Sequence, residues 1–559
     1  MIQFLVYNYI KMGDLQKMII KGNILNVFTD EIQPGEIKVN NGIIESIKEV
    51  DQYFPDIIVP GFIDAHVHIE SSRVTPSRFA EVALRHGTTS VITDPHEIAN
   101  VMGLEGIEYM INDAKFAPLR FYFTAPSCVP STSFENNGAR IGCETIDSLL
   151  KRDEFVALSE VMDYHGVVNG DDDLINKINI AKKYKKPIDG HAPLLSGMEL
   201  QEYVKYGIST EHECISKREA LEKKRLGMKI MIREGSESHM LEELIHSPTD
   251  FIVTDDISSE DLVKGHMNIR LRQAVDLGMD PFEAIRKVTL NPAEHYNLNS
   301  GCIAPGKNAD FVFIDNLNDF RVKRVVVNGN TIFKKQKILY RAKPLPLETT
   351  INLNNKKAED FDVKANDPNK KSAVVNVMRV VPNTIITTKD TAKLTIDHGR
   401  IIPSVFEDVL KISVVERYGG NTMCNGFISG FGLKNGAIAS SISHDSHNII
   451  VVGTNSEYMA EATNKIIENK GGIVAISNQE QMDLPLPIAG LMSDRPVLEV
   501  AKKSEELNEM VDRMGCSLER PFTTLSFMAL PVVPELKITN KGLIDVNQNK
   551  IIDVVNHED

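Results

Sequence analysis

The sequence predicts an α/β protein that combines a (β/α)8 TIM-like barrel, a composite small β-domain and an additional C-terminal α+β domain. Three observations lead to this prediction. Strand-like and helix-like segments alternate over residues 59–300, as parallel βα units do. Two strand-rich pieces flank that region, and a further strand-rich unit follows a polar linker. The chain length of 559 residues suits about three such units better than one.

The predicted barrel has a set of strand candidates, each followed by a stretch that can form a helix. Their ranges are 57–68, 89–96, 120–127, 155–162, 186–193, 207–213, 229–236 and 250–256. Polar residues gather at the C-terminal ends of these strands, which is where barrels of this kind hold their chemistry. An open sheet of βα units without closure is the alternative that periodicity alone leaves.

The composite β-domain is predicted from residues 18–58 and 301–345. Both contain short alternating runs separated by turn sequences such as NG and PGE, a pattern typical of antiparallel strands. We interpret residues 1–17 as an N-terminal extension. Residues 346–372 are polar and form the predicted linker to a C-terminal domain over residues 373–559.

The composition indicates which kinds of binding partner and which cellular compartment to expect. The net charge of -15 offers no basic surface to nucleic acid, and no segment reaches the roughly 18 apolar residues of a membrane span. The six cysteines lack paired spacing, which argues against a disulfide framework and fits a reducing cytoplasm. No secretory signal pattern is visible at the N-terminus. We therefore expect a cytoplasmic protein that binds a small molecule rather than nucleic acid or a membrane, and base rates favour a homo-oligomer.

The strongest chemical signal is a set of histidines and carboxylates at predicted strand ends. Alternate residues of a strand point to the same face, so the two histidines of the H-x-H sequence at 66–68 can reach one ion. Imidazole and carboxylate ligands suit zinc, manganese or iron. Singly, each histidine could instead be satisfied by hydrogen bonds. Together the side chains predict a metal centre, and they are His66, His68, Glu160, His191, His212 and Asp255.

Two further groups at strand ends are candidates for binding substrate. Asp94, His96 and Glu97 follow the second strand, where Asp94 could alternatively cap a helix that starts at Pro95. Arg233 and Ser236 follow the seventh strand, and a surface salt bridge is the alternative there.

The C-terminal unit contains the run Ser443-His444-Asp445-Ser446-His447-Asn448. Histidine and aspartate side chains in such a run can bind a metal or cover a pocket. A hydrogen-bonded turn also explains Asp, Ser and Asn. We expect His444, Asp445 and His447 to form a lid or a second site beside the barrel.

Long, chemically particular motifs resemble those of the adenine deaminase family, within the amidohydrolase superfamily. They include PGFIDAHVHIESS at 60–72, TDPHEIANVMG at 93–103, IDGHAP at 188–193 and GFGLKNGAIASSISHDSHNIIVVGTN at 430–455. The resemblance covers essentially all of the chain after residue 18. Leu194, Glu211 and His239 depart from the family pattern, which affects the expected pocket shape but none of the proposed ligands.

The resemblance implies two divalent ions, with Mn(II) first and Fe(II) and then Zn(II) as alternatives. His66, His68 and Asp255 would hold one ion, and His191 and His212 the other. Glu160 would either bridge the ions or carry a proton between groups.

The implied reaction is the hydrolytic deamination of adenine to hypoxanthine and ammonia in purine salvage. A metal-activated hydroxide would attack C6, and Asp255 would move the proton to the leaving amine. The alternative is another amidohydrolase acting on a cyclic amide or on a different aminopurine. Dihydropyrimidinases place a lysine where Glu160 stands, which argues against that branch. A non-catalytic barrel should have lost a ligand, whereas all the ligands are present.

Overall fold

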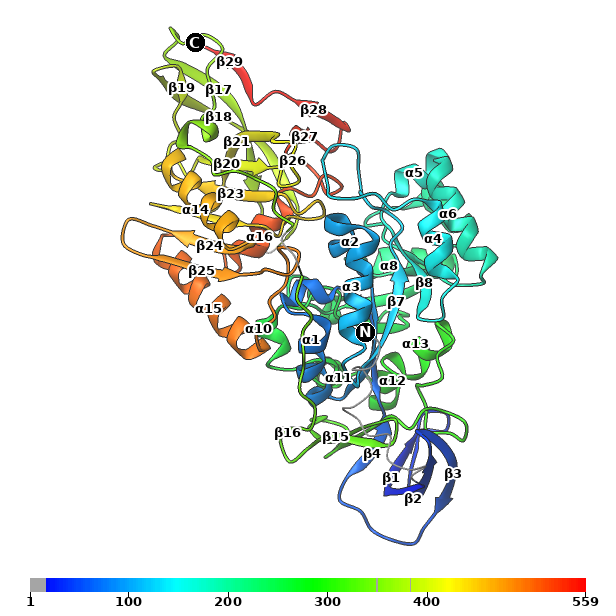
Figure 1. Ribbon diagram of the computed structural model, residues 1–559. Helices are drawn as coiled ribbons and strands as arrows, with labels where there is room; N and C mark the ends of the chain where they lie inside the picture. The colour runs from blue at the N-terminus through cyan, green and yellow to red at the C-terminus, as the bar shows by residue number, and fades with distance from the viewer. Residues whose placement is uncertain (1–16, 348–349, 383) are drawn as a thin grey trace, which may run out of the picture.

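The computed structural model describes residues 17–347, 350–382 and 384–559. The predicted extension over residues 1–17 therefore lies, except for Lys17, outside the described residues. Three parts follow one another in Figure 1: a small β-sheet at one end of the molecule, a barrel in the middle and a C-terminal domain beside the barrel. No helix within the described ranges is long and apolar enough to cross a membrane.

The predicted (β/α)8 barrel is confirmed. Its parallel strands fall into a five-stranded set, β5–β9, and a three-stranded set, β10–β12. The strands are β5 Phe62–Val67, β6 Thr88–Thr93, β7 Arg120–Ala125, β8 Phe155–Val161, β9 Ile188–Gly190, β10 Thr210–Glu211, β11 Lys229–Arg233 and β12 Phe251–Val253. Each lies within or against one of the predicted ranges.

Backbone hydrogen bonds join the two sets of strands into a closed ring. Ser209 donates to the Ile188 carbonyl at 2.8 Å on one side. On the other side Asp255 donates to the His66 carbonyl at 2.9 Å, and His68 donates to the Asp255 carbonyl at 3.0 Å. The hydrogen bonds that close the barrel seam, between β12 and β5, therefore fix the backbone of three predicted ligands, His66, His68 and Asp255.

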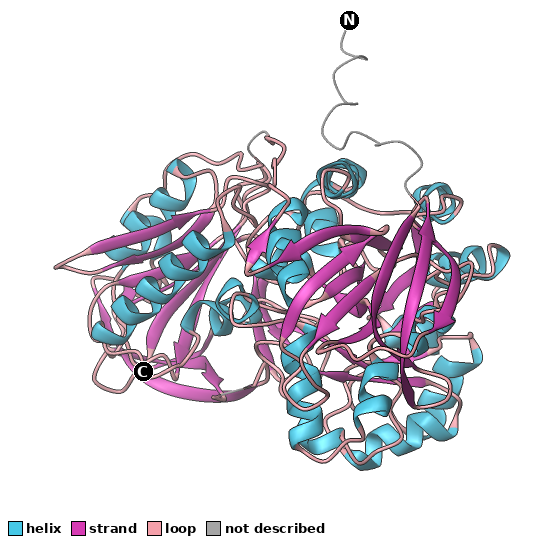
Figure 2. Ribbon diagram, turned by 90° about the horizontal axis from the view of Figure 1, so that it is seen from below, coloured by secondary structure: helices cyan, strands magenta, loops and turns pink. Residues whose placement is uncertain are grey.

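Helices connect the strands and cover the barrel (Figure 2). They are α1 Pro76–Ala83, α2 His96–Met102, α3 Leu104–Ala114, α4 Cys143–Leu150, α5 Tyr164–Asn169, α6 Asp172–Lys183, α7 Gly197–Lys205, α8 Lys217–Arg225, α9 Leu241–Leu244, α10 Ser259–Leu262, α11 Met267–Asp276, α12 Pro281–Lys287 and α13 Leu290–His295, with short 3-10 turns η1 Ile69–Ser72 and η2 Leu84–His86. Several begin at side-chain caps, as at Asp280, whose carboxylate accepts from the Phe282 and Glu283 N–H groups.

One eight-stranded sheet combines strands from both sides of the barrel sequence, in the order β16-β15-β14-β13-β4-β1-β2-β3. The strands are β1 Met18–Asn26, β2 Glu31–Asn40, β3 Ile43–Glu49, β4 Ile57–Pro60, β13 Phe311–Ile314, β14 Val322–Val327, β15 Asn330–Lys334 and β16 Lys337–Ile338. Antiparallel pairing of β4 with β13 joins the two chain segments.

The predicted strand over residues 57–68 is wrong in one respect, because it is two strands. Gly61 separates β4, in the small sheet, from β5, in the barrel. A Cβ atom at Gly61 would lie 2.0 Å from the Thr89 hydroxyl, so only glycine permits this close approach. The sequence is hydrophobic on both sides of Gly61, so the pattern gave no sign of a boundary between two strands.

The predicted C-terminal α+β domain is also confirmed. Its ten-stranded sheet runs in the order β19-β18-β17-β21-β20-β23-β22-β24-β25, with β29 paired to β17, and a three-stranded sheet β26–β28 lies beside it. The strands are β17 Ser372–Val380, β18 Thr387–Asp397, β19 Arg400–Ile401, β20 Leu410–Val415, β21 Met423–Ser429, β22 Ala437–Ser440, β23 Ile449–Gly453, β24 Gly472–Ile476, β25 Gln481–Pro485, β26 Leu536–Thr539, β27 Gly542–Asp545, β28 Lys550–Ile552 and β29 Val555–Glu558. The helices are α14 Ser456–Glu468, α15 Val497–Arg513 and α16 Pro521–Phe527.

The polar segment that precedes this domain packs onto it. It contains a short 3-10 turn, η3 Ala358–Phe361, whose Phe361 side chain is fully buried. Lys356 also donates its N–H to Asn464 of α14 at 2.7 Å. Most of the expected linker therefore follows the surface of the C-terminal domain.

The C-terminal domain contacts the barrel on the side where the barrel strands end. Helix α15 lies against α10, and Arg73 reaches Ser504 of α15 at 2.5 Å. Asn448 donates to the Asn136 carbonyl at 2.8 Å. This contact places the run at 443–448 next to the predicted ligands.

Candidate metal centre and active site

The barrel brings the six predicted ligands into one cluster. Asp255 Oδ1 lies 2.9 Å from His66 Nε2 and 3.0 Å from His68 Nε2. The His66 and His212 rings stack with their centroids 4.3 Å apart. Five of the six side chains are buried, and His191 is partly buried.

Glu160, on β8, links the two halves of this cluster. Its Oε2 lies 2.8 Å from His191 Nδ1 and 3.2 Å from His212 Nε2. Its Oε1 lies 3.3 Å from His68 Nε2. Burial by itself would raise the pKa of the Glu160 carboxyl, but hydrogen bonds from these imidazoles hold that pKa well below its usual range. Glu160 is thus placed to contact ions on either side or to exchange protons with the imidazoles.

Asp255 occupies the junction between β12 and β5. Its backbone lies in the left-handed region, with φ of 55°, and the two hydrogen bonds of the barrel seam hold it there. Burial disfavours its charged form, yet the Arg233 guanidinium and then the His66 and His68 imidazoles hold the pKa of Asp255 well below its usual range. The carboxylate is therefore charged at neutral pH.

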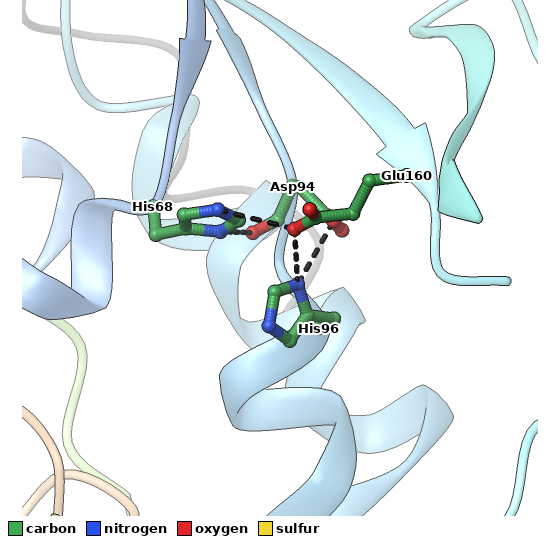
Figure 3. A group of neighbouring side chains, drawn as sticks. All are labelled: His68, Asp94, His96 and Glu160. Carbon is green, nitrogen blue, oxygen red and sulfur yellow. Dashed lines mark hydrogen bonds and ion pairs between the residues drawn. The ribbon is translucent and has the colours of Figure 1, made fainter. Parts of the chain in front are cut away.

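Figure 3 shows how the second strand end joins the cluster: His68, Asp94, His96 and Glu160 converge on one point. His96 Nδ1 lies 2.9 Å from Asp94 Oδ2 and 3.5 Å from Glu160 Oε1. Ser159 donates its hydroxyl to Asp94 Oδ2 at 2.7 Å. Helix α2 begins at His96 without any side-chain cap, so Asp94 points into the site and does not cap the helix.

Glu97 connects the barrel to the C-terminal domain. Its Oε1 lies 2.7 Å from His444 Nδ1, and its Oε2 contacts His447 Nε2. The Ser443 N–H donates to His447 Nδ1 at 3.2 Å. A neutral His447 then carries its proton on Nε2 and donates it to Glu97. The interface therefore fixes the tautomer of His447.

His444 and Asp445 lie in the wall of the pocket that contains the candidate ligands. Burial lowers the pKa of His444, but the charge of Glu97 outweighs it and raises that pKa to about 9. Asp445 is fully buried, which raises the pKa of its carboxyl. The run at 443–448 thus supplies polar groups to the pocket from outside the barrel.

Arg233 lies among three carboxylates rather than at the surface. Its Nε is 2.5 Å from Asp255 Oδ2 and its Nη2 is 2.9 Å from Asp256 Oδ2. Its Nη1 contacts Glu213. The arginine therefore orients Asp255 from behind the candidate ligands.

Ser236 is placed in a neighbouring cavity. Its hydroxyl donates to Asp261 at 2.8 Å and accepts from the Ser258 N–H at 2.8 Å. The pocket that contains the ligands does not include Ser236 among its lining residues, whereas the adjacent cavity does.

The sequence interpretation omitted two carboxylates and an apolar wall. Glu213 Oε1 lies 3.5 Å from His212 Nε2, and Asp256 pairs with Arg233. Each directly follows a predicted ligand, which was the available signal. The apolar wall comes largely from the C-terminal domain, and it consists of Met162, Ile385, Phe527, Leu530, Val532 and Val533.

The donors fit divalent metal ions. His66 Nε2 and Asp255 Oδ1 are buried and 2.9 Å apart, yet neither has a hydrogen-bond partner within the described part of the chain. Buried polar atoms without partners are rare and require an explanation, such as an ion. One ligand atom from each of His66, His68 and Asp255 lies within 4.8 Å of the others, and the same holds for His66, Glu160 and His212. Imidazole and carboxylate donors suit Mn, Fe or Zn.

A (β/α)8 barrel that ends its strands in an H-x-H pair, further histidines and an eighth-strand aspartate is an amidohydrolase. The model of the Amidohydrolase family matches residues 57–332, and that of the Adenine deaminase C-terminal domain matches residues 384–550. The chain belongs to the adenine deaminase family, whose amidohydrolase domain implies a divalent metal.

Full-length relatives support this assignment. An adenine deaminase of Methanosphaera stadtmanae is 68% identical, and the match covers 97% of this chain and 100% of the relative. One of Methanothermobacter thermautotrophicus is 48% identical over 95% of this chain and 99% of the relative. One of Sulfurovum sp. is 42% identical over 96% and 99% respectively. The similarity thus includes the barrel and the C-terminal domain together.

Proposed function

We propose that the protein hydrolyses adenine to hypoxanthine and ammonia. The observation that carries the proposal is Asp255, a charged carboxylate that faces His66 and His68 on one side and Arg233 on the other. Membership of the adenine deaminase family supports adenine as the substrate.

The candidate ligands divide into two groups. His66, His68 and Asp255 would hold one divalent ion, and His191 and His212 would hold a second, with Glu160 within reach of both groups. Divalent ions, when bound, supply a water molecule acidic enough to act as a nucleophile near neutral pH. We favour Mn(II), with Fe(II) as the next choice.

Proton transfer falls to Asp255. Its pKa lies well below neutral pH, so it is ready to accept a proton from the attacking water. Passing that proton to the amino group at C6 makes ammonia the leaving group. Arg233 favours the charged carboxylate before the transfer and also compensates the buried Glu213 and Asp256, so its removal should affect both the base and the stability of the fold.

The purine ring would lie between the ligands and the apolar wall from the C-terminal domain. Phe527 offers a flat apolar surface, and His444 stacks on its ring with the centroids 4.6 Å apart. Asp94, His96 and Glu97 occupy the second strand end, where they can contact the ring nitrogens and stabilise a protonated ring. Asp445 completes this side of the pocket, and His447 lies behind it in contact with Glu97.

We further propose that the enzyme works in purine salvage in the cytoplasm and forms a homo-oligomer. The six cysteines, none of which forms a disulfide among the described residues, support a reducing compartment. Size-exclusion chromatography with light scattering tests the oligomer directly.

The function is tested by following ammonia release from adenine by Mn(II)-loaded protein. Adenosine, cytosine and guanine are measured in parallel, and Asp255→Asn is the control. Release from adenine alone, lost in the variant, supports both substrate and site. No release by a protein that contains about two ions per chain would redirect the substrate to cyclic amides or other aminopurines.

A further inference from the structure

A second cavity lies directly beside the active-site pocket, between the barrel and the C-terminal domain. About 40 Å³ of it is accessible to a water-sized molecule. Glu97, Asp256, His444 and Phe527 line both spaces. The stacked pair of His444 and Phe527 is therefore part of the wall that separates the cavity from the site of chemistry.

The ionisable groups of the cavity are four carboxyl groups, one arginine and the two histidines His444 and His447. Its carboxylates come from Glu70, Glu97, Glu237 and Asp256. Arg73 is the arginine among its lining residues, and its Nη1 is occupied by Glu260 at 3.3 Å and Ser504 at 2.5 Å.

Most of these carboxylate oxygens already have partners. Both oxygens of Glu97 contact histidines. Those of Asp256 accept from Ser71 at 2.5 Å and from Arg233 at 2.9 Å. Glu237 lies 3.7 Å from Arg520, which partly compensates its charge.

Two of these carboxyl groups each have one buried oxygen without a hydrogen-bond partner among the described residues, and these oxygens are Glu70 Oε2 and Glu237 Oε1. Glu70 is the more deeply buried of the two, with only 3% of it exposed, and its Oε1 accepts from the Ile98 N–H at 3.2 Å. A buried carboxylate oxygen without a partner is costly unless a cation or a donor meets it or the group is protonated. Serine and threonine hydroxyls surround the same space and can accept further hydrogen bonds, and they are Ser71, Ser236, Ser258, Ser440, Thr523 and Ser526.

We propose that this cavity binds a monovalent cation and receives the ammonium ion that the reaction releases. The role as product site rests on the proposed deamination of adenine, whereas the binding of a cation does not. Ammonium is a small cation with four N–H donors, so it matches the free Glu70 oxygen and several hydroxyl acceptors.

The product reaches the cavity across a short path. Ammonia leaves C6 beside Asp255 and takes up a proton at neutral pH. Movement of the Phe527 and His444 side chains then connects the two spaces, since both side chains line both. Ammonium would thereby leave without passing the purine product.

Cation binding is tested with crystals grown in sodium salts and soaked in thallium(I) acetate, because thallium(I) replaces ammonium and scatters anomalously. We expect an anomalous peak beside Glu70 Oε2 in the unmodified enzyme and none there in Glu70→Gln. Absence of the peak in the unmodified enzyme, or an equal peak in the variant, would overturn the proposal. This result does not depend on deaminase activity, so it separates the cation site from the proposed function.

The product role is tested by inhibition with ammonium chloride, with hypoxanthine formation measured by chromatography. Glu70→Gln should weaken the inhibition by about tenfold, since one charge-assisted hydrogen bond is lost. Glu505→Gln, on the exposed side of α15, is the matched control and should behave as the unmodified enzyme. Equal inhibition of enzyme and Glu70→Gln, or equal inhibition by potassium chloride, would refute a product site.

Discussion

Arg233 Nε lies 2.5 Å from Asp255 Oδ2, while the other oxygen of Asp255 faces His66 and His68. The aspartate is thus held between a permanent cation and the candidate ligands. Since both Arg233 and Asp255 are buried, this pair has little competition from solvent.

Replacing Arg233 by methionine should leave buried carboxylates without their counter-charge. We expect a loss of about 3–5 kcal/mol in the free energy of unfolding, because breaking a buried ion pair from one side is strongly destabilising. Denaturant titration measures this loss. Arg233→Lys keeps the positive charge but not the planar guanidinium group. Its free energy of unfolding should therefore lie between those of the unmodified enzyme and Arg233→Met. If Arg233→Lys matches the unmodified enzyme in stability and activity, the fork geometry is unimportant.

Glu160→Gln separates the two roles that remain open for this residue. If Glu160 bridges two ions, the variant should bind about one ion per chain instead of two, because amide oxygen is a weaker ligand than carboxylate. If it only carries protons, the metal content should be unchanged while kcat falls by about 10²-fold or more. Elemental analysis beside steady-state kinetics distinguishes the outcomes.

Glu97→Gln should weaken the link between the barrel and the C-terminal domain. The contacts of Glu97 with His444 and His447 are buried and charge-assisted, so we expect kcat/KM for adenine to fall by at least about tenfold. Glu105→Gln, at an exposed position of α3, is the control. A double-mutant cycle with His444→Asn should show that the two changes are not additive. Additive effects would contradict a direct coupling.

Lys537 gives a dependence of stability on pH. Burial lowers its pKa from 10.5 to about 7, and its Nζ donates to the Ile385 and Phe527 carbonyls. Between pH 7 and 10.5 the unfolded chain binds more protons than the folded one at this side chain, so its contribution to stability rises with pH. The unfolding free energy of the enzyme minus that of Lys537→Met should therefore increase from pH 7 to pH 9. Lys502→Met, at an exposed position, should show no such trend.

Much of the barrel could be predicted because its information is local. Most of the strands carry a hydrophobic run and end in polar residues, so strands and candidate ligands could be placed together. The short strands β9 and β10, with the sequences IDG and TE, do not. The need for glycine at the break between β4 and β5 could not be predicted in this way, because it comes from the close approach of the Thr89 side chain. That contact is tertiary and leaves no trace in the hydrophobic pattern.

The contact of Glu97 with His444 and His447 shows a second limit of local patterns. Both segments were expected near the site, but their pairing depends on how the C-terminal domain packs on the barrel. The same packing supplies Phe527 and the rest of the apolar wall. In the sequence, the hydrophobic residues of this wall cannot be distinguished from residues of the hydrophobic core.

The hydrogen bond between His444 and Glu97 joins residues 347 positions apart in the chain. During synthesis on the ribosome, every barrel residue that we assign to ion binding emerges long before the wall that closes the pocket. A nascent barrel can therefore take up its ions while its mouth is still open to solvent. Chain order thus allows metal loading before the exclusion of water and the binding of a base.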